Sequence, residues 1–159
     1  IVGQLRELEK PAPSFGVESD LSFVIEDIRA TLEALLSPSH TLAVDLTVDA
    51  CVPAGRADLE RIVLNLVVNA KEAMQSGGSV SVVTRRNASG VSLAVQDFGS
   101  GIAPEQAAQI FEPYFTTKSG RNTGLGLFAV ATIARRTSGT VTIESAPGAG
   151  TTVTVTWAG

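Results

Sequence analysis

Apolar residues recur along this chain in two patterns, helical spacing in some segments and alternation in others. Apolar positions at three- and four-residue steps predict a helix over about 57–76, and similar spacing predicts a helix over about 21–36 that Asp20 caps. Shorter helices are expected over about 104–110 and 125–137. Alternating or short apolar runs predict strands over 41–48, 79–86, 91–97, 140–144 and 151–157.

The order of these elements is α-β-α-β-β-α-α-β-β, and most strands follow one another through short connections. This order favours an α+β domain of two layers, a mixed but mostly antiparallel sheet with helices on one face. Residues 1–19 have a mixed pattern, and Pro11 and Pro13 interrupt their helical spacing. We expect 1–19 to be a linker or the trailing end of an upstream helical domain, and 20–159 to form one domain. The first residue is Ile1 rather than Met, which is consistent with a piece of a longer protein.

Composition and charge narrow the classes of function. The chain has 159 residues, of which 44% are hydrophobic and 18% are charged, and this balance is typical of a globular domain. A net charge of −4 disfavours binding to nucleic acid, because neutralising phosphates requires a surplus of Lys and Arg. No apolar run approaches the roughly 18 residues of a membrane span, so we expect no membrane contact. Cys51 is the only cysteine, which fits a reducing compartment such as the cytoplasm.

The helix expected over 57–76 carries a polar stripe beside its apolar one. Asn65, Asn69 and Glu72 stand four and three residues apart, so their side chains share one face. Asn is a poor residue for a helix interior, because its amide competes for backbone hydrogen bonds. An amide oxygen at this face can complete the shell of a Mg²⁺ ion whose other ligands are phosphate and water. The alternative interpretation is an ordinary solvated helix face.

The segment DFGSGI (97–102) begins at the end of a predicted strand. A carboxylate at a strand end can accept a hydrogen bond from the exocyclic amine of a purine, and Asp97 has this position. Gly99 and Gly101 would let the backbone approach the ring with no side chain between them. The alternative interpretation is an ordinary Asp-Gly turn.

Two later glycine clusters are TGLGL (123–127) and GAGT (148–151). Glycines at the start of a helix leave backbone N–H groups that can bind an anion, and the helix dipole strengthens that binding. The second cluster precedes the last predicted strand, where the alternative interpretation is a hairpin turn.

A dinucleotide-binding fingerprint is a competing interpretation of the first of these clusters. Gly124, Gly126 and Ala129 fit the spacing G-x-G-x-x-A, and Glu144 follows Gly124 by 20 residues, as a ribose-binding carboxylate would. The fingerprint needs a buried strand directly before its first glycine, and the polar residues that precede Gly124 cannot form one. The predicted strands also fail to alternate with helices, so the sequence argues against this fold.

Five segments together resemble the ATP-binding catalytic domain of sensor histidine kinases, which belongs to the gyrase, heat-shock ATPase, kinase and mismatch-repair (GHKL) superfamily. The resemblance covers roughly residues 20–157 and keeps the family's order of motifs. The forms EPYFTTK and NAKEAM are similar to those of the nitrogen-regulator type of histidine kinase. The matching segments are the N box NLVVNAKEAM (65–74), the glycine box DFGSGI (97–102), the F box FEPYFTTK (111–118), and the later glycine boxes TGLGL (123–127) and GAGT (148–151).

The resemblance implies the Bergerat ATP-binding fold, with Mg·ATP held between helices. It implies that Asn69 ligates Mg²⁺ and that Asn65 supports the site from the same helix face. It also implies that Asp97 binds the adenine amine and that Thr151 backs Asp97, often through water. The residues that shape the adenine pocket would be Gly99, Gly101 and Ile102.

A lid over residues 116–124 is the other part of the site that the resemblance implies. Lys118 and Arg121 flank this lid, where either can neutralise charge on the β- and γ-phosphates, or be an ordinary solvated cation. The implied phosphate- and nucleotide-binding residues of the lid and the following helix start are Thr123, Gly124, Leu125, Gly126 and Leu127.

One position separates the kinases from the ATPases of the superfamily. The ATPases place a Glu four residues before the metal-binding Asn, where it polarises a water, and this chain has Asn65 there. An amide cannot act as a base, which favours phosphoryl transfer over hydrolysis. Two alternatives stay open, a GHKL-type ATPase and a non-catalytic regulatory module that binds nucleotide.

The resemblance also requires a phosphate-accepting histidine. His40 lies in SPSHT, with proline before it and no acidic residue directly after it, so we interpret it as a loop histidine and not the acceptor. The expected acceptor lies on a helical dimerisation domain of the same protein outside this chain. The implied partners are that domain and, indirectly, a response-regulator receiver domain, and the full protein is expected to be a homodimer. The chain alone should bind Mg·ATP without labelling itself.

Overall fold

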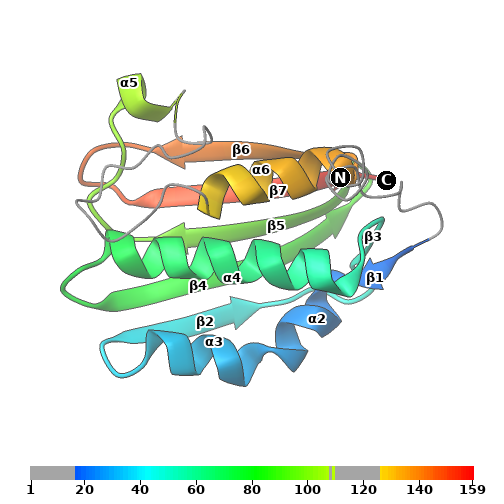
Figure 1. Cartoon of the computed structure of the whole chain (residues 1–159), viewed down its shortest axis with the longest axis horizontal. Helices are drawn as coiled ribbons and strands as arrows, with labels where there is room; N and C mark the ends of the chain where they lie inside the picture. The colour runs from blue at the N-terminus through cyan, green and yellow to red at the C-terminus, as the bar shows by residue number, and fades with distance from the viewer. Residues whose placement is uncertain (1–16, 108, 110–125) are drawn as a thin grey trace, which may run out of the picture.

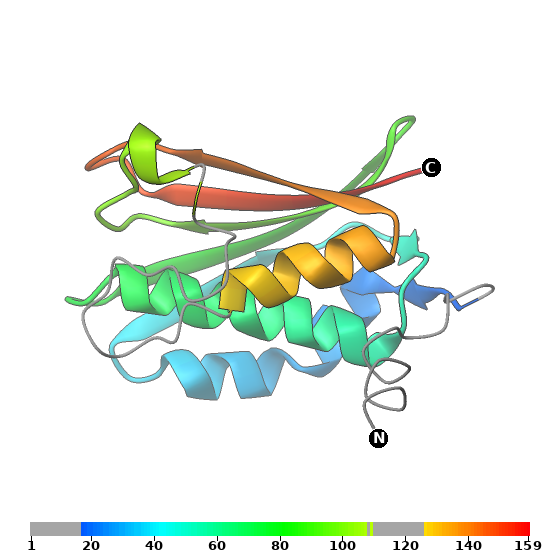
Figure 2. The same ribbon diagram turned by 45° about the horizontal axis from the view of Figure 1, so that its top comes forward.

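A five-stranded sheet with helices over one of its faces forms the body of the molecule (Figure 1). The computed structural model describes residues 17–107, 109 and 126–159. The strand order is β2-β4-β5-β7-β6, in which β2 and β4 are parallel and every other neighbouring pair is antiparallel. Figure 2 shows the two layers from the side, with α2, α3, α4 and α6 beneath the sheet and the short helix α5 at its upper edge. The predicted α+β sandwich is therefore confirmed.

Four of the five strands of the main sheet extend slightly beyond their predicted bounds, and the first strand ends earlier than predicted. That strand, β2, ends at Asp45, three residues before the predicted end. Two strands of two residues each, β1 and β3, pair with one another in a separate small sheet that the alternation did not predict. The bounds are β1 Ser19–Asp20, β2 His40–Asp45, β3 Cys51–Val52, β4 Gly78–Asn87, β5 Gly90–Asp97, β6 Gly139–Ser145 and β7 Thr151–Ala158.

The helices match the predicted segments with one break. The segment predicted as one helix over 21–36 forms two, separated at Ile28, and the Asp20 side chain caps the first by accepting from the Phe23 N–H at 3.1 Å. None of the helices in the described part of the chain is long and apolar enough to cross a membrane. The bounds are α2 Leu21–Asp27, α3 Arg29–Leu36, α4 Arg56–Ala73, α5 Pro104–Ala107 and α6 Gly126–Arg136.

The core lies between the sheet and the helices. Alternate residues of β5 and β7 face it, because side chains alternate between the two faces of a strand. Trp157 is the largest of the fully buried side chains, and its indole N–H donates to the Thr137 hydroxyl at 3.0 Å, just after α6. The buried face of the long helix α4 packs on the same core through Leu59, Ile62, Val63, Leu66, Val67 and Ala70.

Candidate functional site

The polar stripe of α4 lies beside the start of α6. Asn65 and Asn69 are both half-buried, and their four-residue spacing places them on one face of α4. A Cβ atom added to Gly126, the first residue of α6, would lie 4.0 Å from the Asn65 side-chain oxygen. The structure therefore brings an amide of the N box next to the glycine-started helix.

Asp97 is the last residue of β5, and its carboxylate is buried. It is only 6% exposed, and one of its oxygens accepts a hydrogen bond from the Gly99 N–H at 2.9 Å. Thr151, the first residue of β7, stands directly opposite Asp97 in the antiparallel pair and is also buried. The two side chains share the core face of the sheet, where directly opposed Cβ atoms lie about 5 Å apart.

The loop after Asp97 lies against the end of α4. A side chain at Gly99 would overlap the carbonyl oxygen of Ala73, the last residue of α4. The Phe98 N–H also donates to the Met74 sulfur at 3.4 Å. Backbone packed this closely leaves room for glycine only, which explains the residue type at this position.

The same loop also lies against the turn between β6 and β7. A side chain at Gly101 would overlap the carbonyl oxygen of Ala146. The Gly148 N–H donates to the Ser100 carbonyl at 2.7 Å. Two glycine boxes that are far apart in the sequence therefore form one continuous structure beside Asp97.

Ser145 joins these two boxes and was missed by sequence reasoning. Its hydroxyl accepts from the Ile102 N–H at 2.7 Å and lies 2.8 Å from the Thr151 hydroxyl. Ile102 and Thr151 were both predicted site residues, and Ser145 connects them. The signal that finds Ser145 is the strand register, which pairs it with Thr151.

His40 is not the loop residue that the sequence suggested. It is the first residue of β2 and is 6% exposed. Its Nε2 lies 2.6 Å from the Met74 carbonyl oxygen, and its Nδ1 lies 2.8 Å from the Ser39 hydroxyl. Since a carbonyl only accepts, Nε2 carries a proton that it donates to Met74, and in the neutral ring Nδ1 then accepts from Ser39. The ring therefore holds the residue that follows α4, and this burial is incompatible with an exposed phosphate acceptor.

The predicted metal ligand Asn69 offers an amide oxygen, a type of donor that Mg²⁺ accepts. Within the described ranges, no three His, Cys, Asp or Glu side chains gather where they would hold a metal ion. Mg²⁺ commonly keeps several waters and takes one or two protein ligands beside substrate phosphates. A single amide oxygen such as that of Asn69 suits this role.

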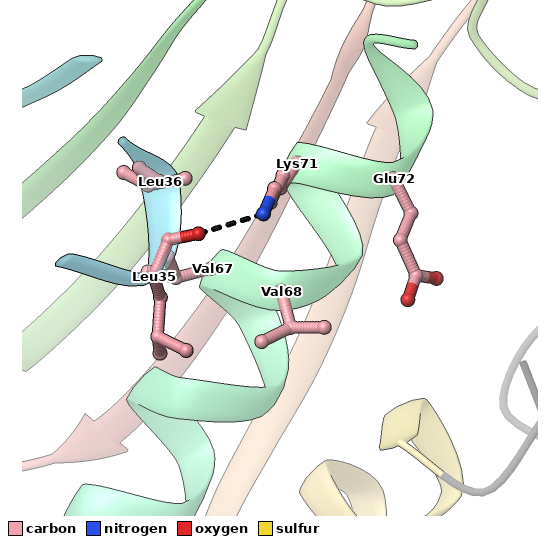
Figure 3. Close-up of a pocket in the computed structure, with 6 residues that line it drawn as sticks. All are labelled: Leu35, Leu36, Val67, Val68, Lys71 and Glu72. Carbon is pink, nitrogen blue, oxygen red and sulfur yellow. Dashed lines mark hydrogen bonds between the residues drawn. The ribbon is translucent and has the colours of Figure 1, made fainter. Parts of the chain in front are cut away.

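A hollow of about 460 Å³ lies between α3 and α4 (Figure 3). The Lys71 ammonium group donates to the Leu35 carbonyl at 2.7 Å. This bond provides a partner for a carbonyl in the last turn of α3. Glu72 of the polar stripe lines this hollow, whereas neither predicted asparagine nor Asp97 does. Its lining residues are Leu35, Leu36, Val67, Val68, Lys71 and Glu72.

Several predicted site residues lie outside the part of the chain that the structure describes. They belong to the lid and the F box (111–118), and they include Lys118, Arg121, Thr123, Gly124 and Leu125. Gly126 and Leu127 are described, and the Leu127 side chain is buried in the core. Glu144, the carboxylate of the competing dinucleotide interpretation, is exposed, and the mostly antiparallel sheet also contradicts that interpretation.

Residues 54–158 match the family described as histidine kinase-, DNA gyrase B-, and HSP90-like ATPase. The chain therefore belongs to this family. The predicted resemblance to the ATP-binding catalytic domain of sensor histidine kinases is confirmed by individual relatives, which are sensor histidine kinases.

Individual relatives agree with this assignment. The sensor histidine kinase ZraS of Escherichia coli K12 is 35% identical over 160 residues, which cover 98% of this chain and 34% of ZraS. The sensor kinase CckA of Brucella abortus is 36% identical over 150 residues, which cover 84% of this chain and 16% of CckA. The solved mycobacterial sensor histidine kinase MprB superposes with a TM-score of 0.78 at 26% identity, over 90% of this chain and 97% of that one. The chain thus spans about a third of the length of ZraS.

Proposed function

We propose that this chain is the phosphoryl-donor domain of a sensor histidine kinase. In this role it binds Mg·ATP and transfers the γ-phosphoryl group to a histidine on a separate helical domain. The observation that carries the proposal is the convergence of α4, the 98–102 loop and the β6–β7 turn around the buried Asp97 carboxylate.

Asp97 is proposed to recognise the adenine base. The Asp97 carboxylate is buried and offers acceptor oxygens, and the exocyclic amine of adenine is a matching donor. Guanine presents a carbonyl oxygen at the same place, and two acceptors facing one another repel. Gly99 and Gly101 hold the loop close to its neighbours, and Ile102 is proposed to line the pocket wall.

The phosphates are proposed to lie between α4 and the start of α6. Asn69 would supply an amide oxygen to Mg²⁺, which neutralises phosphate charge when it is bound. Asn65 lies beside Gly126, where the backbone N–H groups of a helix start favour an anion. We propose that Lys118, Arg121 and the backbone of residues 123–125 close over the phosphates from the lid.

Asn65 also favours transfer over hydrolysis. At position 65, four residues before Asn69, the side chain is an amide, which cannot remove a proton from a water as the Glu of the ATPases does. A histidine nitrogen needs no such help, since its neutral ring already offers a lone pair. Positioning of the acceptor then supplies most of the catalysis.

The proposed partners are supported by the likeness to sensor histidine kinases. The acceptor histidine is assigned to a helical dimerisation domain of the same protein, and the phosphoryl group passes from there to a receiver domain. The proposal includes a homodimeric full protein that works in the cytoplasm, where ATP is available.

The test is a phosphoryl-transfer assay with γ-labelled ATP. The chain is incubated alone and with a helical domain that carries the acceptor histidine. Acid-labile label should appear on the added domain only, and replacing Asn69 by Ala should abolish it. Steady ATP hydrolysis by the chain alone would instead favour an ATPase. Nucleotide binding with no label on any added acceptor would favour a regulatory module.

A further inference from the structure

Three polar side chains form a row across the sheet where its apolar core ends. Asp97 on β5 is paired with Thr151 on β7, and Thr151 is paired with Ser145 on β6. We call Asp97, Thr151 and Ser145 the carboxylate–hydroxyl row. The next row inward on the same face is apolar and consists of Val95, Val153 and Ile143. Burying polar groups at this depth raises the free energy of the folded state unless their hydrogen bonds are satisfied.

The Ser145 hydroxyl uses all of its hydrogen-bonding capacity. It has three neighbours, the Ile102 N–H at 2.7 Å, the Gly150 carbonyl at 3.0 Å and the Thr151 hydroxyl at 2.8 Å. A hydroxyl has one proton to donate and two lone pairs to accept with. The carbonyl can only accept and the N–H can only donate. Ser145 therefore donates to Gly150, and Thr151 must donate its own proton to Ser145.

This assignment fixes what Thr151 presents to Asp97. With its proton directed at Ser145, the Thr151 oxygen has only lone pairs to offer on its other side. Asp97 stands beside it, and in its ionised form its carboxylate offers only lone pairs as well. These two side chains, with Asp97 ionised, therefore both offer acceptors where they adjoin.

We propose that Ser145 is a positioning residue for nucleotide selection, and this proposal rests on the proposed function. By holding the proton of Thr151, Ser145 keeps the Thr151 hydroxyl from donating at the base-binding edge, so that this edge favours a purine with an exocyclic amine. By binding Ile102 and Gly150 together, it also holds the two glycine boxes at a fixed separation.

Replacing Ser145 by Ala tests the proposal. The change releases the Thr151 proton, which can then point to Asp97 or to a carbonyl on the base. Calorimetric titration with ADP and with IDP, which has a carbonyl in place of the amine, measures the outcome. We expect the ADP Kd to rise about tenfold and the IDP Kd to rise less, so that the preference for ADP falls about threefold or more. Ser145→Thr keeps the hydroxyl and should restore both values.

A buried hydroxyl pair elsewhere provides a matched control. The Ser22 hydroxyl lies 2.8 Å from that of Thr84, whose strand position faces Leu93, four residues along β5 from Asp97. Ser22→Ala should lower the urea midpoint to a similar extent as Ser145→Ala, yet leave the ADP-to-IDP ratio unchanged.

The outcomes separate this proposal from the proposed function. Suppose that the unmodified chain prefers ADP to IDP, and that Ser145→Ala lowers the affinity for both nucleotides by the same factor. Ser145 is then only a scaffold residue, and the proposal is wrong. An unchanged ADP affinity, or a ratio shift as large in Ser22→Ala, also overturns it. If the unmodified chain binds neither nucleotide, it is the proposed function that fails.

Discussion

Replacing Gly101 by alanine is expected to damage the site far more than the same change at Gly148. Both glycines have left-handed backbone, with φ of +76° and +78°. Alanine in this region costs about 1–2 kcal/mol, and both variants bear that cost. The two glycines differ in their surroundings. Among the described residues, chain neighbours aside, no atom lies within 4 Å of a Cβ added at Gly148.

At Gly101 the added carbon meets the backbone of the β6–β7 turn. It would overlap the carbonyl oxygen of Ala146 and lie 2.7 Å from the carbonyl carbon. Ordinary carbon contacts are about 3.5–4.0 Å, so the loop must move by about 1 Å. That movement disrupts the bond from the Ile102 N–H to Ser145, at 2.7 Å, and the bond from the Gly148 N–H to Ser100, also at 2.7 Å. Each bond contributes about 1 kcal/mol, so Gly101→Ala should cost about 2 kcal/mol more than Gly148→Ala.

Urea unfolding followed by circular dichroism measures this difference, with the slope m checked for constancy. In parallel, calorimetry should show weakened ATP binding in Gly101→Ala and near-normal binding in Gly148→Ala. Equal losses of stability in the two variants would refute the reasoning, because the contact with Ala146 would then contribute nothing.

Three other changes test separate parts of the structure. Asn69→Ala should abolish the gain in ATP affinity that Mg²⁺ provides while leaving metal-free binding unchanged, and a retained Mg²⁺ effect in calorimetry would contradict the metal role. His40→Ala should lower the free energy of unfolding by about 2–3 kcal/mol, because it removes a buried ring and its bond to the Met74 carbonyl; an unchanged urea midpoint would contradict this. The hydrogen bond and charge of Arg85 lower the pKa of Asp45, so Arg85→Ala should raise that pKa toward its usual value in an NMR titration. Because a lowered pKa contributes stability that is lost as pH falls through it, the variant should lose less stability on acidification than the parent, although the effect of this exposed pair is small.

The fold was largely predictable because its main elements follow clear apolar patterns. The spacing in α4 and the alternation in β5 and β7 identify their buried faces without knowledge of neighbours. The spacing in 21–36 is continuous across Ile28, so it could not reveal the break there. The two-residue strands β1 and β3 are too short to have a pattern, and only their pairing defines them.

The candidate site was predictable where chemistry is local and unpredictable where it depends on register. Asp97 and its glycines form one short segment, so residue types alone suggested their role. Ser145 acts through Thr151 and Ile102, which only the pairing of β6 with β7 and the loop packing bring to it. His40 was misplaced for the same reason, since its partner is a carbonyl 34 residues away.

The central claim is that the pocket at Asp97 binds the adenine base of ATP. Calorimetric titration of the chain and of Asp97→Asn with ATP and GTP tests it most directly. We predict a single ATP site per chain that strongly prefers ATP over GTP, and loss of most of that preference in Asp97→Asn, because an amide can donate to the guanine carbonyl. ATP binding with equal strength and equal selectivity in both proteins, or no ATP binding at all, would contradict the account.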